Sequence, residues 1–328
     1  MPQTDTHAFD QLTPDFIMDA VESLGYRCDC RILTLNSYEN RVYQVGIEEE
    51  QPLIVKFYRP DRWSREQILE EHSFSQELAD HELPVVAPLV HCSGTTLHDY
   101  KGFMFSLSPR KGGQAPELDN LEHLEIIGRL LGRIHLIGST HPFQYRPKLD
   151  SRSHGHDCVA FVSENFIPIE YKESYLSLTR DILQRIDECF NRLSGIRFIR
   201  THGDCHSGNM LWRDNLPNFV DFDDARMAPA IQDFWMLLSG SNDQQRRQLD
   251  KILNAYHQFY DFNPLELQLI EPLRTLRMIY YSAWLARRWD DPAFPRTFPW
   301  FNTMQYWGEH TLELREQMAA LQEPSLQF

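Results

Sequence analysis

Hydrophobic side chains in the first third of the chain follow first a helical and then an alternating pattern. Apolar residues recur at helical spacing over 14–24, where Thr13 before Pro14 is a predicted N-cap. Short alternating runs then predict a five-stranded sheet, with strands at 31–35, 41–45, 52–58, 83–90 and 103–107. One helix interrupts these strands at 62–78, and Ser64 is its predicted N-cap.

After residue 108 the pattern is mainly helical. The run 108–113, with a proline and two glycines, predicts a boundary between an N-terminal lobe at 1–108 and a C-terminal lobe at 109–328. Residues 139–169 predict an irregular segment, and helices are predicted at 121–136, 175–193, 231–238, 245–260, 266–289 and 303–321. The predicted class is α+β, with a small antiparallel sheet and one main helix before a larger, mostly helical part.

Composition and charge limit the kinds of partner. At 328 residues, with 24% charged and 42% hydrophobic residues, the chain has the composition of an ordinary globular protein. Its 32 Lys+Arg and 47 Asp+Glu give a net charge of −15, which argues against nucleic acid or an anionic membrane as the main partner. The beginning of the chain does not resemble a signal peptide and the six cysteines are scattered, so we expect a cytoplasmic protein with reduced thiols. A monomer is a separate expectation.

The polar stretch 198–226 carries the candidate chemistry. Asp204 precedes Asn209 with four residues between them, and Asp221 follows an apolar run. This spacing matches the catalytic loop of protein-kinase-like enzymes, Asp-x-x-x-x-Asn followed by a metal-binding Asp. Asn209 and Asp221 offer the hard oxygen ligands that Mg²⁺ prefers, which leaves Asp204 to accept the proton of an attacking hydroxyl.

Turn-forming residues around this stretch predict an ordered loop. Gly203 and Gly208 permit tight turns. The runs 210–212 and 219–222, separated by turn residues, predict a hairpin that returns Asp221 to the vicinity of the loop. Cys205 lies inside the loop, and we expect it to be partly exposed and open to oxidation.

A metal-dependent hydrolase is a second interpretation of the same residues. Zinc or iron could be bound by the side chains of His202, Asp204, Cys205 and His206. The two histidines are four residues apart, as on one face of a helix, but Gly203 and Gly208 disfavour a helix here. A glycine-bounded loop suits phosphoryl transfer better.

Lys56 is the candidate phosphate-binding cation. It lies between Val55 and Phe57 in a predicted strand, and its side chain points to the opposite face from theirs. In protein-kinase-like enzymes such a lysine pairs with nucleotide phosphates and with a glutamate of the next helix. We predict that this partner is Glu71 among the candidates Glu70, Glu71 and Glu77, while a solvated helix face is the alternative for all three.

Two further positions leave alternatives open. Residues 36–40 take the place of a glycine-rich phosphate loop without containing a glycine, and Ser37 with nearby backbone N–H groups could bind phosphate. A plain hairpin turn is the other interpretation. Asp233 could cap the helix predicted at 231–238, or it could hold the backbone of the catalytic loop.

These motifs together resemble known enzymes. The segment 202–209, His-Gly-Asp-Cys-His-Ser-Gly-Asn, with Val-Asp-Phe-Asp-Asp at 220–224 resembles the aminoglycoside phosphotransferase and choline kinase superfamily. More closely, the chain resembles the bacterial stress response kinase A family over nearly its whole length, at 35–44, 55–60, 231–238 and 284–289. The resemblance implies a bilobal protein-kinase-like fold and an ATP- and magnesium-dependent serine/threonine protein kinase of the stress response, which phosphorylates itself and unidentified protein substrates.

The resemblance also implies roles for individual residues. Asp204 and Asp221 would act in catalysis, Asn209 and Asp221 would bind magnesium, and Ser37 would contact ATP, with Lys56 and Glu71 completing the predicted ATP site.

The chain departs from eukaryotic protein kinases at three places: Gly203 replaces the arginine of His-Arg-Asp, His206 stands where a lysine is usual, and Asp223 replaces the glycine after Phe222. Whether Asp223 joins the metal ligands is left open. A small-molecule kinase and a non-catalytic regulator remain alternatives.

Overall fold

The computed structural model describes residues 9–193 and 195–326, which fall into two compact units. The first unit contains the chain through Glu117 together with Phe143–Arg146 and His206–Ala225, and the second contains Leu118–Pro142, Pro147–Cys205 and the chain from Arg226. The chain therefore enters each unit more than once. The simple division into 1–108 and 109–328 remains a prediction.

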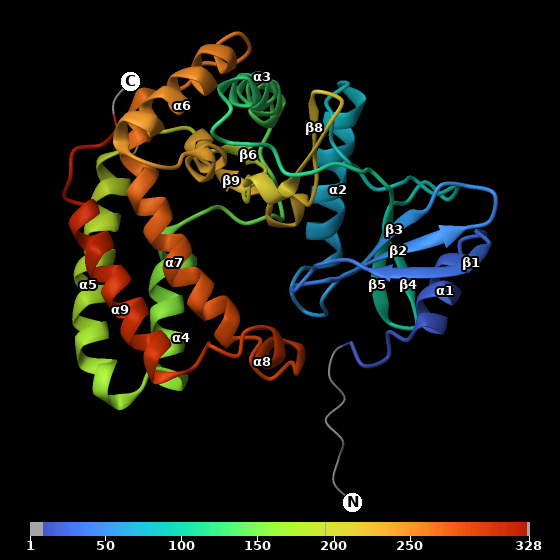
Figure 1. The fold of residues 1–328 in the computed structure, drawn as a ribbon, viewed down its shortest axis with the longest axis horizontal. Coiled ribbons are helices and arrows are strands. Elements are labelled where there is room, and N and C mark those ends of the chain that lie inside the picture. The colour runs from blue at the N-terminus through green and yellow to red at the C-terminus, as the bar shows by residue number, and fades with distance from the viewer. Residues whose placement is uncertain (1–8, 194, 327–328) are drawn as a thin grey trace, which may run out of the picture. The chain divides into compact units, whose positions relative to one another are not determined.

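A five-stranded sheet forms the centre of the first unit, as the sequence predicted (Figure 1). Its order is β1-β2-β3-β5-β4, and every neighbouring pair is antiparallel. The strands are β1 (Cys28–Thr34), β2 (Arg41–Ile47), β3 (Leu53–Phe57), β4 (His98–Tyr100) and β5 (Phe103–Pro109).

One strand prediction was wrong. Residues 83–90 do not join the sheet, and the fifth strand is the short β4 instead. Pro84 and Pro88 lack the N–H that a ladder needs, so this segment does not form a continuous strand. A single bridge joins its Val85 to Phe219.

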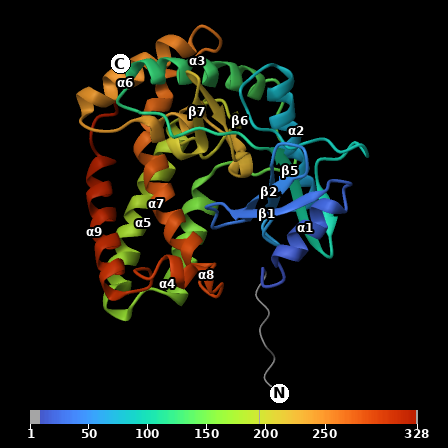
Figure 2. The same ribbon diagram turned by 45° about the vertical axis from the view of Figure 1, so that its right-hand side comes forward.

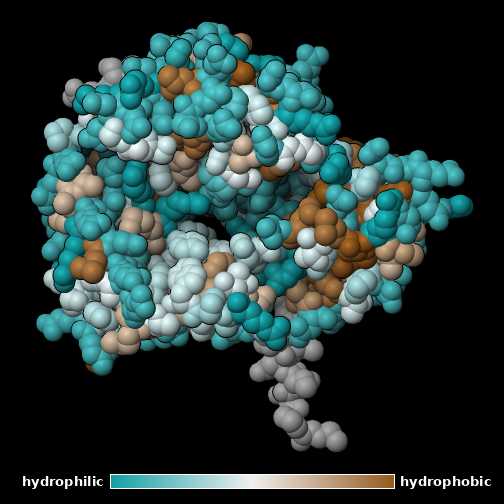
Figure 3. All heavy atoms as spheres, in the orientation of Figure 1, coloured by the Kyte–Doolittle hydropathy of each residue, from teal (hydrophilic) through white to brown (hydrophobic). Residues whose placement is uncertain are grey.

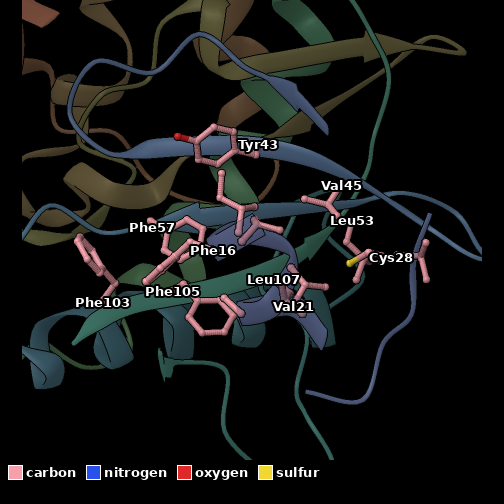
Figure 4. Packing of buried hydrophobic residues seen from close by; sticks show 14 residues of the cluster. Phe16, Val21, Cys28, Tyr43, Val45, Leu53, Phe57, Phe103, Phe105 and Leu107 are labelled. Carbon is pink, nitrogen blue, oxygen red and sulfur yellow. The ribbon is translucent and has the colours of Figure 1, made fainter. Parts of the chain in front are cut away.

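Helix α1 (Pro14–Glu22) covers one face of the sheet and supplies much of its core (Figure 4). The predicted cap is present, because Thr13 Oγ1 accepts a hydrogen bond from Phe16 N at 3.3 Å. Phe16 lies against Phe57, and Phe57 stacks on Phe105 with ring centroids 5.4 Å apart. Because these rings are buried, the position of β3, and with it that of Lys56, is set by packing.

Helix α2 (Arg65–Asp80) is the other main helix of the first unit. The predicted N-cap is confirmed: Ser64 and Gln67 form a reciprocal capping box. Its buried Phe74 contacts Phe143 and Phe222 edge to face, so the helix packs on the segment that follows Asp221.

The second unit is mostly helical. Helices α3 (Leu121–Gly138) and α6 (Asn242–Tyr256) lie side by side (Figures 1 and 2). Their close approach requires glycine, since a Cβ at Gly128 would lie 2.3 Å from the carbonyl oxygen of Ile252. A second group packs together, formed by α4 (Asp157–Asn165), α5 (Ile169–Arg192), α7 (Ile270–Ala286) and α9 (Met304–Ala320), and the short α8 (Ala293–Thr297) follows α7.

Two helix predictions need correction. Residues 231–238 form short 3₁₀ turns, Ala230–Asp233 and Trp235–Leu237, because the polar groups here bond to side chains and backbone outside the segment. The segment predicted as irregular contains a π-helical turn, Arg152–His156, followed by α4. The short strands β6 (Ile199–Thr201) and β9 (Arg226–Ala228) pair with each other, and β6 contacts the 3₁₀ turn Ala230–Asp233.

One face of the molecule can be described by the hydropathy of its residues. The face drawn in Figure 3 is mostly hydrophilic, in keeping with a mean hydropathy of −0.48. Among the described residues, none of the helices combines the length and the apolar character that a bilayer crossing requires.

Candidate active site

The predicted hairpin is present and brings the two candidate metal ligands together. Strands β7 (Met210–Arg213) and β8 (Leu216–Phe219) pair in antiparallel fashion around a turn at Asp214 and Asn215, which both have positive φ. Just after the hairpin, Val220 N donates to the carbonyl oxygen of Asn209 at 3.0 Å. Asn209 and Asp221, the residue after Val220, therefore lie at the same end of the hairpin.

Asp221 adopts an unusual backbone conformation for a non-glycine residue. Its φ and ψ are 59° and 65°, in the left-handed region. Strained residues of this kind concentrate at functional sites, where the surrounding structure holds them. The side chain of Asp221 is 54% exposed, and one of its oxygens lies 2.9 Å from Lys56 Nζ.

Lys56 forms ion pairs with two carboxylates that follow the hairpin, those of Asp221 and Asp223. Among the described residues its ion pairs are with Asp221 at 2.9 Å and with Asp223 at 3.0 Å, rather than with the expected Glu71. Burial opposes the charge on Lys56, but the two carboxylates raise the pKa of its ammonium group well above the ordinary value. Lys56 is therefore a permanent cation next to the candidate metal ligand.

Asp223 is the buried anion of the site. Burial alone would raise its pKa, but Lys56 and Arg62 lower the pKa of this carboxyl far below its usual range. One oxygen is held by Lys56 and the other by Arg62 at 2.9 Å. Asp223 is therefore ionised and forms ion pairs with both Lys56 and Arg62.

Arg146 supports the same segment and was not identified from the sequence. Its guanidinium is buried and donates to the carbonyl oxygens of Ala225 at 2.9 Å, of Phe222 at 3.2 Å and of Asp223. Glu70 in turn accepts the backbone N–H of Arg146 at 2.7 Å. Arg146 lies 75 positions before Asp221 in the sequence, in a segment predicted as irregular, and no local pattern identified it.

Glu71, the predicted partner of Lys56, is buried on α2. Burial raises the pKa of its carboxyl to about 7, and the charge of Lys56 acts in the opposite direction. Its neighbour His72 is also buried, and burial lowers the pKa of His72 to about 3, so this histidine is neutral. The imidazole is bonded to Tyr58 Oη at 2.6 Å. The pairing of Glu71 with Lys56 remains a prediction.

The raised pKa of Glu71 predicts a pH-dependent stability. The folded protein binds this proton more tightly than the unfolded chain, so the stabilisation is present below about pH 4.5 and is lost as the pH rises through about 7. Relative to Glu71→Gln, the wild type should lose on the order of 3 kcal/mol of unfolding free energy between those limits. Urea unfolding at several pH values measures this difference, and Glu77→Gln on the same helix is the matched control. Parallel pH profiles for wild type and Glu71→Gln would contradict the assignment.

Ser37 lies in the connection between β1 and β2. Its hydroxyl donates to the carbonyl oxygen of Asn40 at 3.1 Å. Asn40 is buried, and its side-chain oxygen accepts the N–H of Arg59 at 3.0 Å. The loop is thus tied to the residues that follow β3, while Tyr38 at its tip is exposed.

Asp204 belongs to the second unit, together with the groups that position it. Its half-buried carboxylate forms an ion pair with Arg277 of α7. Its backbone N–H is directed to Nδ1 of His202 at 3.4 Å. Arg277 was not identified from the sequence, because it is 73 residues away and lies within an ordinary helical pattern.

Asp233 holds the backbone of the candidate catalytic loop, which was one of its two predicted roles. It is completely buried and accepts hydrogen bonds from His202 N at 2.8 Å and Gly203 N at 2.9 Å. His135 Nε2 lies 3.0 Å from the same carboxylate. Gly203 has a φ of +83°, so the loop uses a conformation that favours glycine at the position where protein kinases carry arginine.

The expectation for Cys205 was wrong. Its thiol is completely buried, and burial together with Asp233 and Asp204 raises its pKa well above the ordinary value. A buried, protonated thiol is inert to oxidation and is a poor zinc ligand. Among the residues that the structure describes, no group of three or more His, Cys, Asp and Glu side chains is arranged to hold a metal ion. The burial of Cys205 and His202 weighs against the hydrolase interpretation.

The available donors fit magnesium rather than zinc. Asn209 offers an amide oxygen and Asp221 an exposed carboxylate, and Mg²⁺ is usually bound by one or two such groups together with substrate phosphates and water. Asp223 has both oxygens occupied by cations, which favours a supporting role for it.

Sequence comparison places the chain among phosphotransferases. Residues 31–270 match the phosphotransferase enzyme family. Stress response kinase A of Salmonella choleraesuis (strain SC-B67) is 46% identical over 321 residues, which cover 98% of this chain and 97% of the relative. The protein of the same name from Escherichia coli (strain K12) is 45% identical, and serine/threonine protein kinase RdoA of Salmonella typhimurium (strain LT2) is 46% identical, both with the same coverage.

Two solved structures of similar fold are named as kinases of small molecules. Amicoumacin kinase hAmiN, solved with AMP-PNP and Ca²⁺, has a TM-score of 0.69 at 18% identity and covers 91% of this chain and 93% of its own. For choline kinase from Cryptosporidium parvum the TM-score is 0.57 at 13% identity, with 89% of each chain covered. The chain therefore has the protein-kinase-like fold, is a kinase, and belongs to the phosphotransferase enzyme family and, within it, to the stress response kinase A group.

Proposed function

We propose that this protein is an ATP- and Mg²⁺-dependent serine/threonine protein kinase that also phosphorylates itself. The observation that carries the proposal is the 46% identity, over nearly the whole chain, with relatives named stress response kinase A and serine/threonine protein kinase RdoA. The names of these relatives also support a role in the stress response.

The site residues divide the work of phosphoryl transfer between them. Asn209 and Asp221 would hold Mg²⁺, and the metal when bound supplies positive charge next to the transferred phosphoryl group. Lys56, a permanent cation beside Asp221, would bind the phosphates of ATP. Ser37 would contact ATP from the glycine-free loop between β1 and β2.

Asp204 would accept the proton of the substrate hydroxyl. Its carboxylate is only half-buried and is held by Arg277, so an incoming hydroxyl shares an oriented acceptor with this guanidinium. Asp233 would keep the loop backbone in place through two N–H groups. Positioning of this kind is a large part of phosphoryl-transfer catalysis, because there is little covalent chemistry for the protein to perform.

The test is incubation of the purified chain with γ-labelled ATP and Mg²⁺, first alone and then with a generic protein acceptor. Label on serine or threonine of the chain or of the acceptor is the expected result. Parallel reactions with aminoglycosides and amino alcohols test the competing small-molecule activity, which the fold neighbours named as amicoumacin and aminopropanol kinases suggest. Labelling of small molecules alone would overturn the proposal.

A further inference from the structure

The loop between β1 and β2 is fixed by ion pairs and not by glycine. Residues 36–40 contain no glycine, whose backbone freedom usually lets such a loop approach phosphates. Glu39 instead forms ion pairs with Arg59 at 3.2 Å and with Arg62 at 3.1 Å. Arg59 also donates its backbone N–H to the side chain of Asn40. The carboxylate of Glu39 is mostly buried, so these pairs are shielded from water.

Arg62 reaches a second segment with the same guanidinium. Nη1 lies 3.1 Å from Glu39 and 2.9 Å from Asp223, and Nη2 lies 3.0 Å from Asp224. The side chain is only 10% exposed. Three carboxylates from two distant parts of the chain thus share one planar fork of N–H donors, an arrangement for which arginine is suited and lysine is not.

The second segment carries the candidate metal ligand. Asp223 and Asp224 follow Asp221 after a single residue, Phe222, and Lys56 forms ion pairs with both Asp221 and Asp223. Arg62 therefore connects the loop expected over the nucleotide to the segment expected to bind the metal, and all of these groups lie in one compact unit. Arg59 also holds this loop, through its ion pair with Glu39 and its hydrogen bonds to the carbonyl oxygens of Glu39 and Tyr38.

We propose that Arg62 is a positioning residue that couples the 36–40 loop to the Asp221–Asp224 segment, so that the nucleotide and the metal are bound by one linked element. The identity of that nucleotide and metal rests on the proposed function, but the link itself does not. In this chain the guanidinium of Arg62 holds a glycine-free loop in place by side-chain ion pairs.

Hydrogen exchange on the full-length protein without nucleotide tests the link directly. Arg62→Lys keeps the charge and loses the fork, so amide exchange should rise in both 36–40 and 221–224, by roughly 10- to 100-fold for the loss of a charge-assisted hydrogen bond. Arg59→Lys is the matched control and should raise exchange in 36–40 alone. Unchanged exchange in 221–224 for Arg62→Lys, or equal effects of the two variants on that segment, would overturn the proposal.

Ligand titration gives a second readout. With a fluorescent ATP analogue, Arg62→Lys should lower nucleotide affinity by roughly 10- to 100-fold. The Mg²⁺ concentration at the midpoint of binding should rise by a similar factor. Arg59→Lys should weaken nucleotide affinity without shifting the Mg²⁺ midpoint. If Arg62→Lys does not fold, Glu39→Gln tests the link from the loop side, and unchanged exchange in 221–224 for that variant contradicts the link. A chain that labels no protein but shows these exchange changes would refute the proposed function and leave the coupling intact.

Discussion

Asp204→Asn is expected to lower the rate of phosphoryl transfer by roughly 10²–10⁴-fold, because the variant keeps the shape of the side chain and loses its proton acceptor. An asparagine oxygen can still accept from Arg277, so the loop should keep its conformation. Single-turnover transfer from labelled ATP measures the chemical step, and titration with an ATP analogue separates it from binding.

The expected pattern is a large loss in rate with nucleotide affinity unchanged. Asp214→Asn is the control, since Asp214 lies at the exposed tip of the β7–β8 hairpin with its side chain 90% exposed. Full transfer activity in Asp204→Asn would exclude this residue as the base. Equal losses in the two variants would point to a general effect of removing a carboxylate.

Asp233→Ala is expected to reduce the unfolding free energy by roughly 3–5 kcal/mol, as for other buried charged groups that lose one partner. Asp233 is completely buried, and its removal leaves the N–H groups of His202 and Gly203 and the imidazole of His135 without their acceptor. Each buried unsatisfied donor costs about 1–3 kcal/mol. Urea unfolding measures the change.

The same substitution should slow phosphoryl transfer even where the protein stays folded. The loop that carries Asp204 loses its anchor, and displacement of a catalytic group by about 1 Å can cost roughly 10²-fold in rate. Activity is therefore compared at a temperature where the folded fraction is close to complete. Asp243→Ala is the control, because Asp243 lies in the first turn of α6 with its side chain 85% exposed. A variant as stable and active as wild type would show that Asp233 does not hold the loop.

Features that depend on neighbouring residues could be predicted from the sequence. The caps at Thr13 and Ser64 follow from polar side chains placed just before apolar helical repeats. The β7–β8 hairpin follows from two short apolar runs separated by turn residues. Failures occurred where a local pattern had two solutions, as at 83–90, where an apolar run with two prolines could not join the ladder.

Charged contacts between distant segments could not be predicted. Arg62, Arg146 and Arg277 look like ordinary surface arginines in the sequence, and each is paired with a candidate site segment 73 to 162 residues away. Which carboxylate Lys56 meets depends on the same packing, and the structure pairs it with Asp221 and Asp223. The burial of Cys205 likewise comes from packing that a short sequence window does not show.

The sequence by itself determined which side chains are candidates for proton transfer and metal binding, because the types and spacing of Asp204, Asn209 and Asp221 are local properties of one short stretch. Only the tertiary structure decided how the surrounding charges are shared. Asp223 became a buried anion between Lys56 and Arg62, and Asp233 became the anchor of the loop. The physical reason is that a buried charge must find partners wherever the fold supplies them, and the fold draws those partners from remote parts of the chain.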